Sequence, residues 1–236
     1  DPLRNAVDSI RANFPSDNPF TSATGINGKC VTGVNKTFIK FPSFNDWAAS
    51  SSFTVSTWFK QNGQTQNNTL GNGPSYLFSL KAVDGYHWSN AVMFLFLEGN
   101  NAGCAVKCMT VSPSVPNDPN SSPADNWFTW EGGQVIAGMC DNNWHHMALV
   151  YDETTSSMKL YIDGVANPNV KTWSGHGKLN LATTKISEYR IGAGPSTSYA
   201  SDDWLACTFK GSMDQFRLYG TALTASQITA LYTGKQ

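Results

Sequence analysis

The chain has 236 residues, enough for one large β domain with a substantial core or for two small domains. Its net charge of −1, with only 14% charged residues, argues against a nucleic acid partner, which requires clustered Lys and Arg. The hydrophobic content of 40% argues against disorder, and the longest apolar run, Ala91 to Leu97, is far below the roughly 20 residues of a membrane-spanning helix.

The first predicted element is a helix over residues 1–14. Leu3, Val7, Ile10 and Phe14 recur at helical spacing, and Pro15 ends the pattern. We interpret residues 1–20 as a lead-in to the domain. The opening Asp1-Pro2 carries no basic or apolar signal region, so any secretion signal has been removed or lies outside this sequence.

From residue 29 onward the apolar pattern becomes that of strands. The eight Trp, thirteen Phe and eight Tyr, together with twenty Gly and eleven Pro, favour an all-β chain with many turns. The run Ala91 to Leu97 is apolar at every position, as expected of a central strand covered on both faces. Asp163-Gly164 predicts a two-residue hairpin turn. The predicted strands contain the segments 37–41, 53–60, 91–97, 144–151, 158–162 and 209–219.

Two stretches are predicted to be loops, and the chain closes with a short helix. Residues 61–75 are rich in Asn, Gln and Gly, and residues 112–126 contain four prolines. Thr224 and Gln227 have the spacing of a capping box, with Leu223 and Ile228 at the flanking apolar positions and Gly234 as a stop. Together these signals predict a two-sheet sandwich over residues 21–236.

The five cysteines do not form an evident framework. Their odd number and irregular spacing favour buried free thiols, and Cys104-x-x-x-Cys108 lacks the spacing of a zinc knuckle. A local bridge between Cys104 and Cys108 requires a tight turn between them.

Three segments resemble the laminin G-like, concanavalin A-like lectin/glucanase superfamily. They are Gly25 to Lys60 with its Phe53-Thr-Val-Ser-Thr-Trp58 strand, the hairpin Asn143 to Gly164, and Gly211 to Ile228. The resemblance implies an antiparallel jelly roll, similar to modules of bacterial surface and secreted carbohydrate-processing proteins. It also implies that the terminal strands pair, which makes Cys30–Cys207 a second candidate bridge. The same fold carries lectins, hydrolases, lyases and protein-binding modules, so function depends on the site.

The sequence offers little for catalysis. Glycoside hydrolysis usually needs two carboxylates, and none of the four glutamates has an acidic neighbour at strand spacing. A lyase constellation is not evident among four arginines. His145 and His146 are adjacent on a predicted strand, so they should face opposite sides, and core histidines are the simpler interpretation. We therefore expect a non-catalytic module, with a hydrolase or lyase as the weaker alternative.

A glycan-binding site is the favoured interpretation, because sugars stack on exposed rings while their hydroxyls bond to amides and carboxylates. Trp127 and Trp130 would face opposite sides if their segment is a strand. With a net charge near zero, we expect a neutral polysaccharide or oligosaccharide as partner. A protein-binding adhesion module is the alternative, since aromatic rims also bind proteins. The candidate residues are Trp88, Trp204, Trp127, Trp130, Asn90, Asp202 and Asp203.

A structural calcium ion is a further expectation. Asp214 should share the core face of its strand with Phe216 and Leu218, and a buried carboxylate needs a cation or N–H donors. Members of the resembled superfamily often hold calcium at a sheet rim, and Asn35 could contribute a ligand there. Capping of backbone N–H groups or pairing with Arg217 or Arg190 is the alternative. We expect the whole module to be extracellular or on the cell surface, as part of a longer chain.

Overall fold

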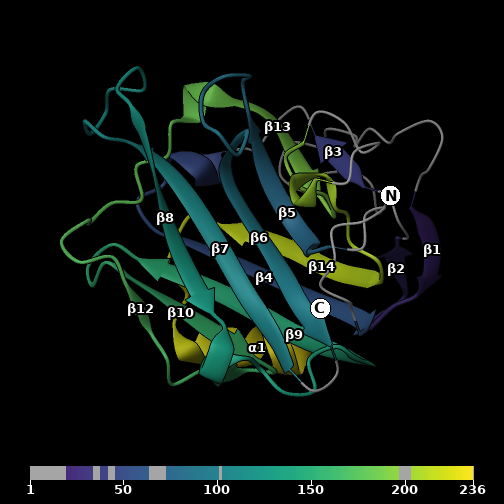
Figure 1. Ribbon diagram of the computed structural model, residues 1–236. Helices are drawn as coiled ribbons and strands as arrows, with labels where there is room; N and C mark the ends of the chain where they lie inside the picture. Colours follow the sequence, from purple (N-terminus) through teal and green to yellow (C-terminus); the bar gives the residue numbers. More distant parts are fainter. Residues whose placement is uncertain are drawn as a thin grey trace.

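A computed structural model describes residues 20–33, 38–41, 46–63, 73–100, 103–196 and 203–235. Within these ranges the strands form two antiparallel sheets that pack face to face, and one helix follows near the C-terminus (Figure 1). The predicted all-β jelly-roll sandwich is confirmed. The helix predicted over residues 1–14 lies outside the described residues, and the domain boundary near residue 20 stays a prediction. No helix in the described ranges is long and apolar enough to cross a membrane.

The larger sheet has eight strands in the described part of the chain. Their order is β1 (Thr21–Thr24), β2 (Lys29–Thr32), β14 (Ser212–Tyr219), β4 (Phe53–Asn62), β9 (Asp141–Asp152), β10 (Ser157–Ile162) and β11 (Val165–Ala166), with β12 (Lys171–Thr172) also paired to β10. The predicted hairpin between β10 and β11 is confirmed. Asp163 and Gly164 both have positive φ, 50° and 77°, as a tight two-residue turn requires.

The smaller sheet has six strands in the order β3 (Ile39–Phe41), β13 (Ile186–Ile191), β5 (Ser75–Ala82), β6 (Ala91–Asn100), β7 (Gly103–Pro113) and β8 (Pro123–Trp130). Short 3-10 turns connect strands at η1 (Asp46–Ala49), η3 (Gly132–Gln134), η4 (Thr183–Lys185) and η5 (Trp204–Ala206). Apolar side chains of the two inner faces, such as Phe53, Leu149, Phe78 and Leu95, are fully buried against one another. Alternation along each strand therefore fixes which residues face the core and which face outward.

Helix α1 (Ala225–Gly234) covers the outer face of the eight-stranded sheet. Thr224 and Gln227 form the predicted capping box, and Ile228 is buried against Leu223 and residues of β9 and β10. Tyr232 stacks on Trp58 of β4 with ring centroids 5.5 Å apart. The helix ends at Gly234, but it is Lys235 that takes the left-handed conformation.

The loop predicted over residues 112–126 is shorter than expected. Strand β7 continues to Pro113 and β8 already begins at Pro123, so only residues 114–122 connect them. Strand β8 is at the end of the sheet order, where a proline loses no ladder hydrogen bond on its outer side. The proline-rich composition therefore marks an edge hairpin.

Asp214 does not face the core, which corrects the sequence prediction. The pairing of β14 with β4 shifts between Asp214 and Arg217, and Gln215 has a positive φ of 50°. This β-bulge changes the alternation, so that Met213 and Phe216 pack on the core while Asp214 lies on the other side. Its two carboxylate oxygens accept the backbone N–H groups of Ile26 at 2.9 Å and of Gln215 at 2.8 Å.

All five cysteines lie within the described residues, and each is a buried free thiol. Cys104 and Cys108 stand four residues apart on the same strand, which separates them by about 13 Å and prevents a bridge. The bridge considered between Cys30 and Cys207 is not formed either.

The calcium ion stays a prediction. Asn35 lies outside the described residues, and within the described ranges no three His, Cys, Asp or Glu side chains gather as a metal site. A resident ion at Asp214 should raise the melting temperature in excess calcium relative to a chelator, because an ion bound only by the folded state stabilises it. The comparison is made on the wild type and on Asp214→Asn, and equal melting temperatures for the wild type would contradict the prediction.

Candidate functional site

The outer face of the six-stranded sheet carries a cluster of aromatic rings. Tyr76 of β5 and Phe94 and Phe96 of β6 point to this face and are almost completely buried. Their neighbours Leu95 and Leu97 point to the core between the sheets. This explains why the run Ala91 to Leu97 is apolar at every position: both faces of β6 are covered.

Trp204 lies at the centre of this cluster. It belongs to η5, and its ring centroid is 5.9 Å from both Phe94 and Phe96 and 6.4 Å from Tyr76. Asp203 fixes the start of η5 by accepting the N–H of Leu205 at 3.1 Å. The indole is therefore held by packing beneath it and by a capped turn beside it.

Two exposed tryptophans flank Trp204, which is itself half-buried. Trp88 lies on the loop between β5 and β6 with 58% of its surface exposed, and Trp127 on β8 with 37% exposed. Their ring centroids are 6.3 and 6.5 Å from that of Trp204. We call Trp88, Trp127 and Trp204 the tryptophan platform. Three rings from three separate segments thus form one apolar surface that is open to solvent.

A carboxylate lies beside the platform. Asp125 accepts the indole N–H of Trp127 at 3.0 Å, and its other oxygen is 4.0 Å from Nε2 of His87. Burial lowers the pKa of His87, so this imidazole is neutral at pH 7. Nδ1 of His87 is 2.7 Å from the Ser89 hydroxyl, which orders the loop that carries Trp88. The charge at this edge of the platform is therefore negative.

A crossing segment, residues 192–196 and 203–210, holds Trp204 on the sheet. The guanidinium of Arg190 on β13 donates to the backbone oxygens of Gly194 at 3.1 Å and Ser196 at 2.7 Å. The N–H groups of Gly194 and Ser196 in turn donate to the oxygens of Cys207, which follows η5, and of Leu205, which lies within η5.

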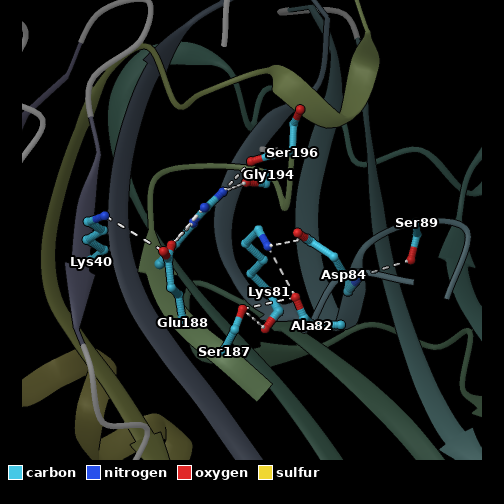
Figure 2. Close-up of polar contacts among 11 residues, drawn as sticks. Lys40, Lys81, Ala82, Asp84, Ser89, Ser187, Glu188, Gly194 and Ser196 are labelled. Carbon is cyan, nitrogen blue, oxygen red and sulfur yellow. Dashed lines mark hydrogen bonds and ion pairs between the residues drawn. The ribbon is translucent and has the colours of Figure 1, made fainter. Parts of the chain in front are cut away.

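The charge of Arg190 is itself balanced. Glu188 accepts from Arg190 at 2.7 Å and pairs with Lys40 at 3.7 Å, as Figure 2 shows beside Gly194 and Ser196. Since Arg190 is only 5% exposed, its ion pair and two carbonyl contacts are what make its burial tolerable. A buried cation on β13 therefore fixes the turn that places Trp204.

Sequence reasoning found part of this site. Trp88, Trp127 and Trp204 come together, whereas the prediction for Trp130 was wrong. Strand alternation turns Trp130 into the core, where it is fully buried and donates to the backbone oxygen of Asn169. Asn90 contributes a left-handed backbone turn, with φ 54° and its carbonyl bound to the N–H of Ala82.

One candidate is not described by the structure, and sequence reasoning missed four residues of the site. Asp202 lies outside the described residues. Sequence reasoning missed Arg190, and it missed the buried rings Tyr76, Phe94 and Phe96 because a run that is apolar at every position does not say which face carries the site.

Two glutamates converge near one end of the same sheet, but they do not resemble a catalytic pair. Glu98 and Glu131 each lie 2.8 Å from the ammonium of Lys107. The contact with Lys107 lowers the pKa of Glu131, and the contacts with both glutamates raise the pKa of Lys107. A general acid needs a raised carboxyl pKa, so this triad is an ion-pair network.

A cysteine near a histidine–aspartate pair is equally unsuited to catalysis. The Cys104 thiol and the positive charge of His145 lower the pKa of Cys140, but Cys140 is completely buried. Both nitrogens of His145 are occupied by carboxylates, Nδ1 by Asp163 at 2.9 Å and Nε2 by Asp141 at 3.1 Å. No nitrogen remains to take a proton from the thiol.

Comparison with known proteins agrees with this architecture. A laminin G-type family model, described as the concanavalin A-like lectin/glucanases superfamily, matches residues 33–229. The chain belongs to this superfamily. The resemblance of the three sequence segments is thereby confirmed. A search of curated proteins found no match.

Solved structures share the superfamily fold at low sequence identity. Domain 4 of the extracellular GH43 arabinanase AbnA from Geobacillus stearothermophilus, in complex with arabinotriose, aligns with a TM-score of 0.59 at 18% identity over 98% of this chain and 92% of that chain. The CBM40 of the Ruminococcus gnavus IT-sialidase, bound to α2,3-sialyllactose, aligns with a TM-score of 0.55 at 14% identity over 86% and 96%. The botulinum neurotoxin serotype G binding domain aligns with a TM-score of 0.58 at 13% identity over 97% of this chain and 48% of that chain.

Substitution of Gly194 should disturb the platform without removing any of its rings. A Cβ atom at Gly194 would lie 2.3 Å from the Leu205 oxygen and 2.9 Å from Cε2 of Tyr76, so η5 must move. We expect Gly194→Ala to cost about 1–3 kcal/mol and to change the tryptophan near-UV circular dichroism. Gly133→Ala is the matched control, because nothing lies within 4 Å of its Cβ position. Equal spectra for the two variants would contradict the placement of Trp204.

His145 should make the stability depend on pH. The contact with Asp163, followed by that with Asp141, raises its pKa to about 9 from the usual 6.5. A raised folded-state pKa stabilises the fold fully below the unfolded-state pKa, and this contribution disappears as the pH rises through about 9.

We therefore expect His145→Gln to lower the free energy of unfolding by roughly 1–3 kcal/mol near pH 6 and by much less near pH 10. Urea denaturation of both proteins at the two pH values measures this. His146 is present in both proteins, so its own titration cancels; burial lowers its pKa to about 4. A difference that does not change with pH would contradict the ion-pair interpretation.

Proposed function

We propose that the chain is a non-catalytic glycan-binding module that binds a neutral oligosaccharide or polysaccharide on the tryptophan platform. The observation that carries the proposal is the open surface of Trp88, Trp127 and Trp204, with rings that match the flat C–H faces of sugars. The buried rings beneath Trp204 keep this surface rigid, which limits the entropy lost on binding.

The charge around the platform supports a neutral ligand. Asp125 lies against Trp127 and His87 is neutral at pH 7, so a carboxylated sugar would meet a like charge. The Asp125 carboxylate can instead accept a bond from a sugar hydroxyl. Asp203 is exposed next to Trp204 in the chain and offers a second acceptor.

The superfamily members of known structure support a binding role. The arabinanase domain was solved with arabinotriose and the sialidase module with sialyllactose, and both share the fold of this chain. Modules of this type act as parts of larger proteins, so we also propose an extracellular or cell-surface location and further domains in a longer chain. A single site with a few stacked rings binds weakly, and repetition on a surface would raise the avidity.

Titration with neutral oligosaccharides, followed by tryptophan fluorescence, tests the proposal. A stacked ring contributes about 1 kcal/mol, so Trp88→Ala and Trp127→Ala should each weaken binding about fivefold. Trp144→Phe, which changes a half-buried tryptophan on β9 of the other sheet, is the matched control and should bind like the wild type.

Two outcomes would contradict the proposal. If no neutral glycan perturbs the wild type, or if the platform variants bind as tightly as it does, the platform is not a glycan site. Retention of a protein ligand by the wild type and its loss in Trp88→Ala would then favour a protein-binding adhesion module.

A further inference from the structure

A groove lies apart from the platform and contains none of the platform residues. It is a groove of about 550 Å³ between three segments: residues 49–51, the β7–β8 hairpin, and residues 173–180. This volume is in the range of small-molecule sites. All of its lining residues belong to the described chain.

The wall formed by residues 173–180 is fixed in place. The N–H of Leu179 donates to the Ser51 oxygen at 2.8 Å, and the Ser112 hydroxyl donates to the Leu179 oxygen at 3.0 Å. The Tyr151 hydroxyl donates to the oxygen of Gly177 at 2.6 Å. Because these contacts reach both sheets, the groove exists before any ligand enters.

An aromatic pair lines the groove. The rings of Trp173 and His176 stack with an interplanar angle of 6°, and Trp173 also packs edge-on against Phe128 of β8 at 6.0 Å. Nε2 of His176 lies 3.3 Å from the Leu179 oxygen. The pair is thus a rigid, flat and partly exposed surface, of the kind on which a sugar ring can stack.

The polar lining differs in charge from the platform. Asn117 and Asn180 reach the groove from left-handed turns, with φ of 65° and 52°, and Ser114 adds a hydroxyl. Lys178 is exposed, and none of the lining residues is acidic. Burial lowers the pKa of His176, so the ammonium of Lys178 is the charge that the groove presents at pH 7.

We propose that this groove is a second binding site, for a sugar that carries a carboxylate. The ring would stack beside Trp173 and His176, the amides of Asn117 and Asn180 would bind hydroxyls, and Lys178 would pair with the carboxylate. The module would then recognise two features of a glycan, binding a neutral part at the platform and an acidic unit in the groove. The groove stands on its own residues and does not require the platform to bind sugar.

Methyl β-glucuronide and methyl β-glucoside are matched probes, because they differ only at C6, a carboxylate in the first and a hydroxymethyl group in the second. Each is titrated into the ¹⁵N-labelled chain and followed by backbone amide shifts. We expect shifts centred on residues 173–180, with the glucuronide bound about fivefold more tightly than the glucoside. Lys178→Gln should remove this preference, while Lys29→Gln, a charge removed from an exposed position on β2, should keep it. Trp173→Ala should weaken both ligands about tenfold.

The outcomes separate this proposal from the first. Equal binding of the two probes, a preference unchanged in Lys178→Gln, or shifts centred on Trp88 and Trp127 would overturn it. Competition by inorganic phosphate as strong as by the glucuronide would also overturn it, because the groove would then bind anions without reading a sugar ring. Since Trp173→Ala could alter the wall itself, its melting temperature and the surface variant Lys178→Gln keep the test decisive. Platform variants such as Trp88→Ala should leave glucuronide binding unchanged, whatever they do to neutral glycans.

Discussion

The six-stranded sheet is apolar on both faces, and this constraint organises the rest of the molecule. One face of β6 packs against the eight-stranded sheet, and the other carries Phe94 and Phe96. Exposure of these two rings to water would be unfavourable. Residues 192–196 and 203–210, which lie between β13 and β14 in the sequence, cover them by crossing the outer face of the sheet. Trp204 is the side chain of this segment that packs directly on both rings.

The position of the crossing segment depends on a buried charge. Arg190 donates to two carbonyls of the crossing segment, while Glu188 and Lys40, both labelled in Figure 2, complete the charge balance. Truncation of Arg190 would remove a donor from two carbonyls, those of Gly194 and Ser196, and one of the two cations beside Glu188, so the damage would exceed that of one lost contact. The site is therefore built on the second face of a core sheet, and its rigidity comes from the same packing that holds the fold together.

The fold could be predicted because its signals are local. Alternation in β4 and β9, the Asp163-Gly164 turn and the Thr224–Gln227 box each specify a neighbouring structure, and each is present. The site could be predicted only in part. The Gly, Asn and Asp neighbours of Trp88 and Trp204 mark them as outside the strands, but Trp130 follows the alternation of β8 and faces the core. The bulge at Gln215 turns Asp214 away from the core. The apolar pattern of the sequence gives no sign of this bulge, although the inserted residue changes which face of the sheet the preceding residues point to.

The position of β8 has a consequence for association. It ends the order of the six-stranded sheet in the described chain, and an unpaired strand edge is a template onto which another chain can add a strand. Pro123 offers no N–H there, and Asp125 and Asn126 place polar side chains along the same edge. Strand addition is therefore disfavoured at the side of the sheet where Trp127 is exposed. A module displayed in many copies could keep this aromatic surface open without its sheets joining edge to edge.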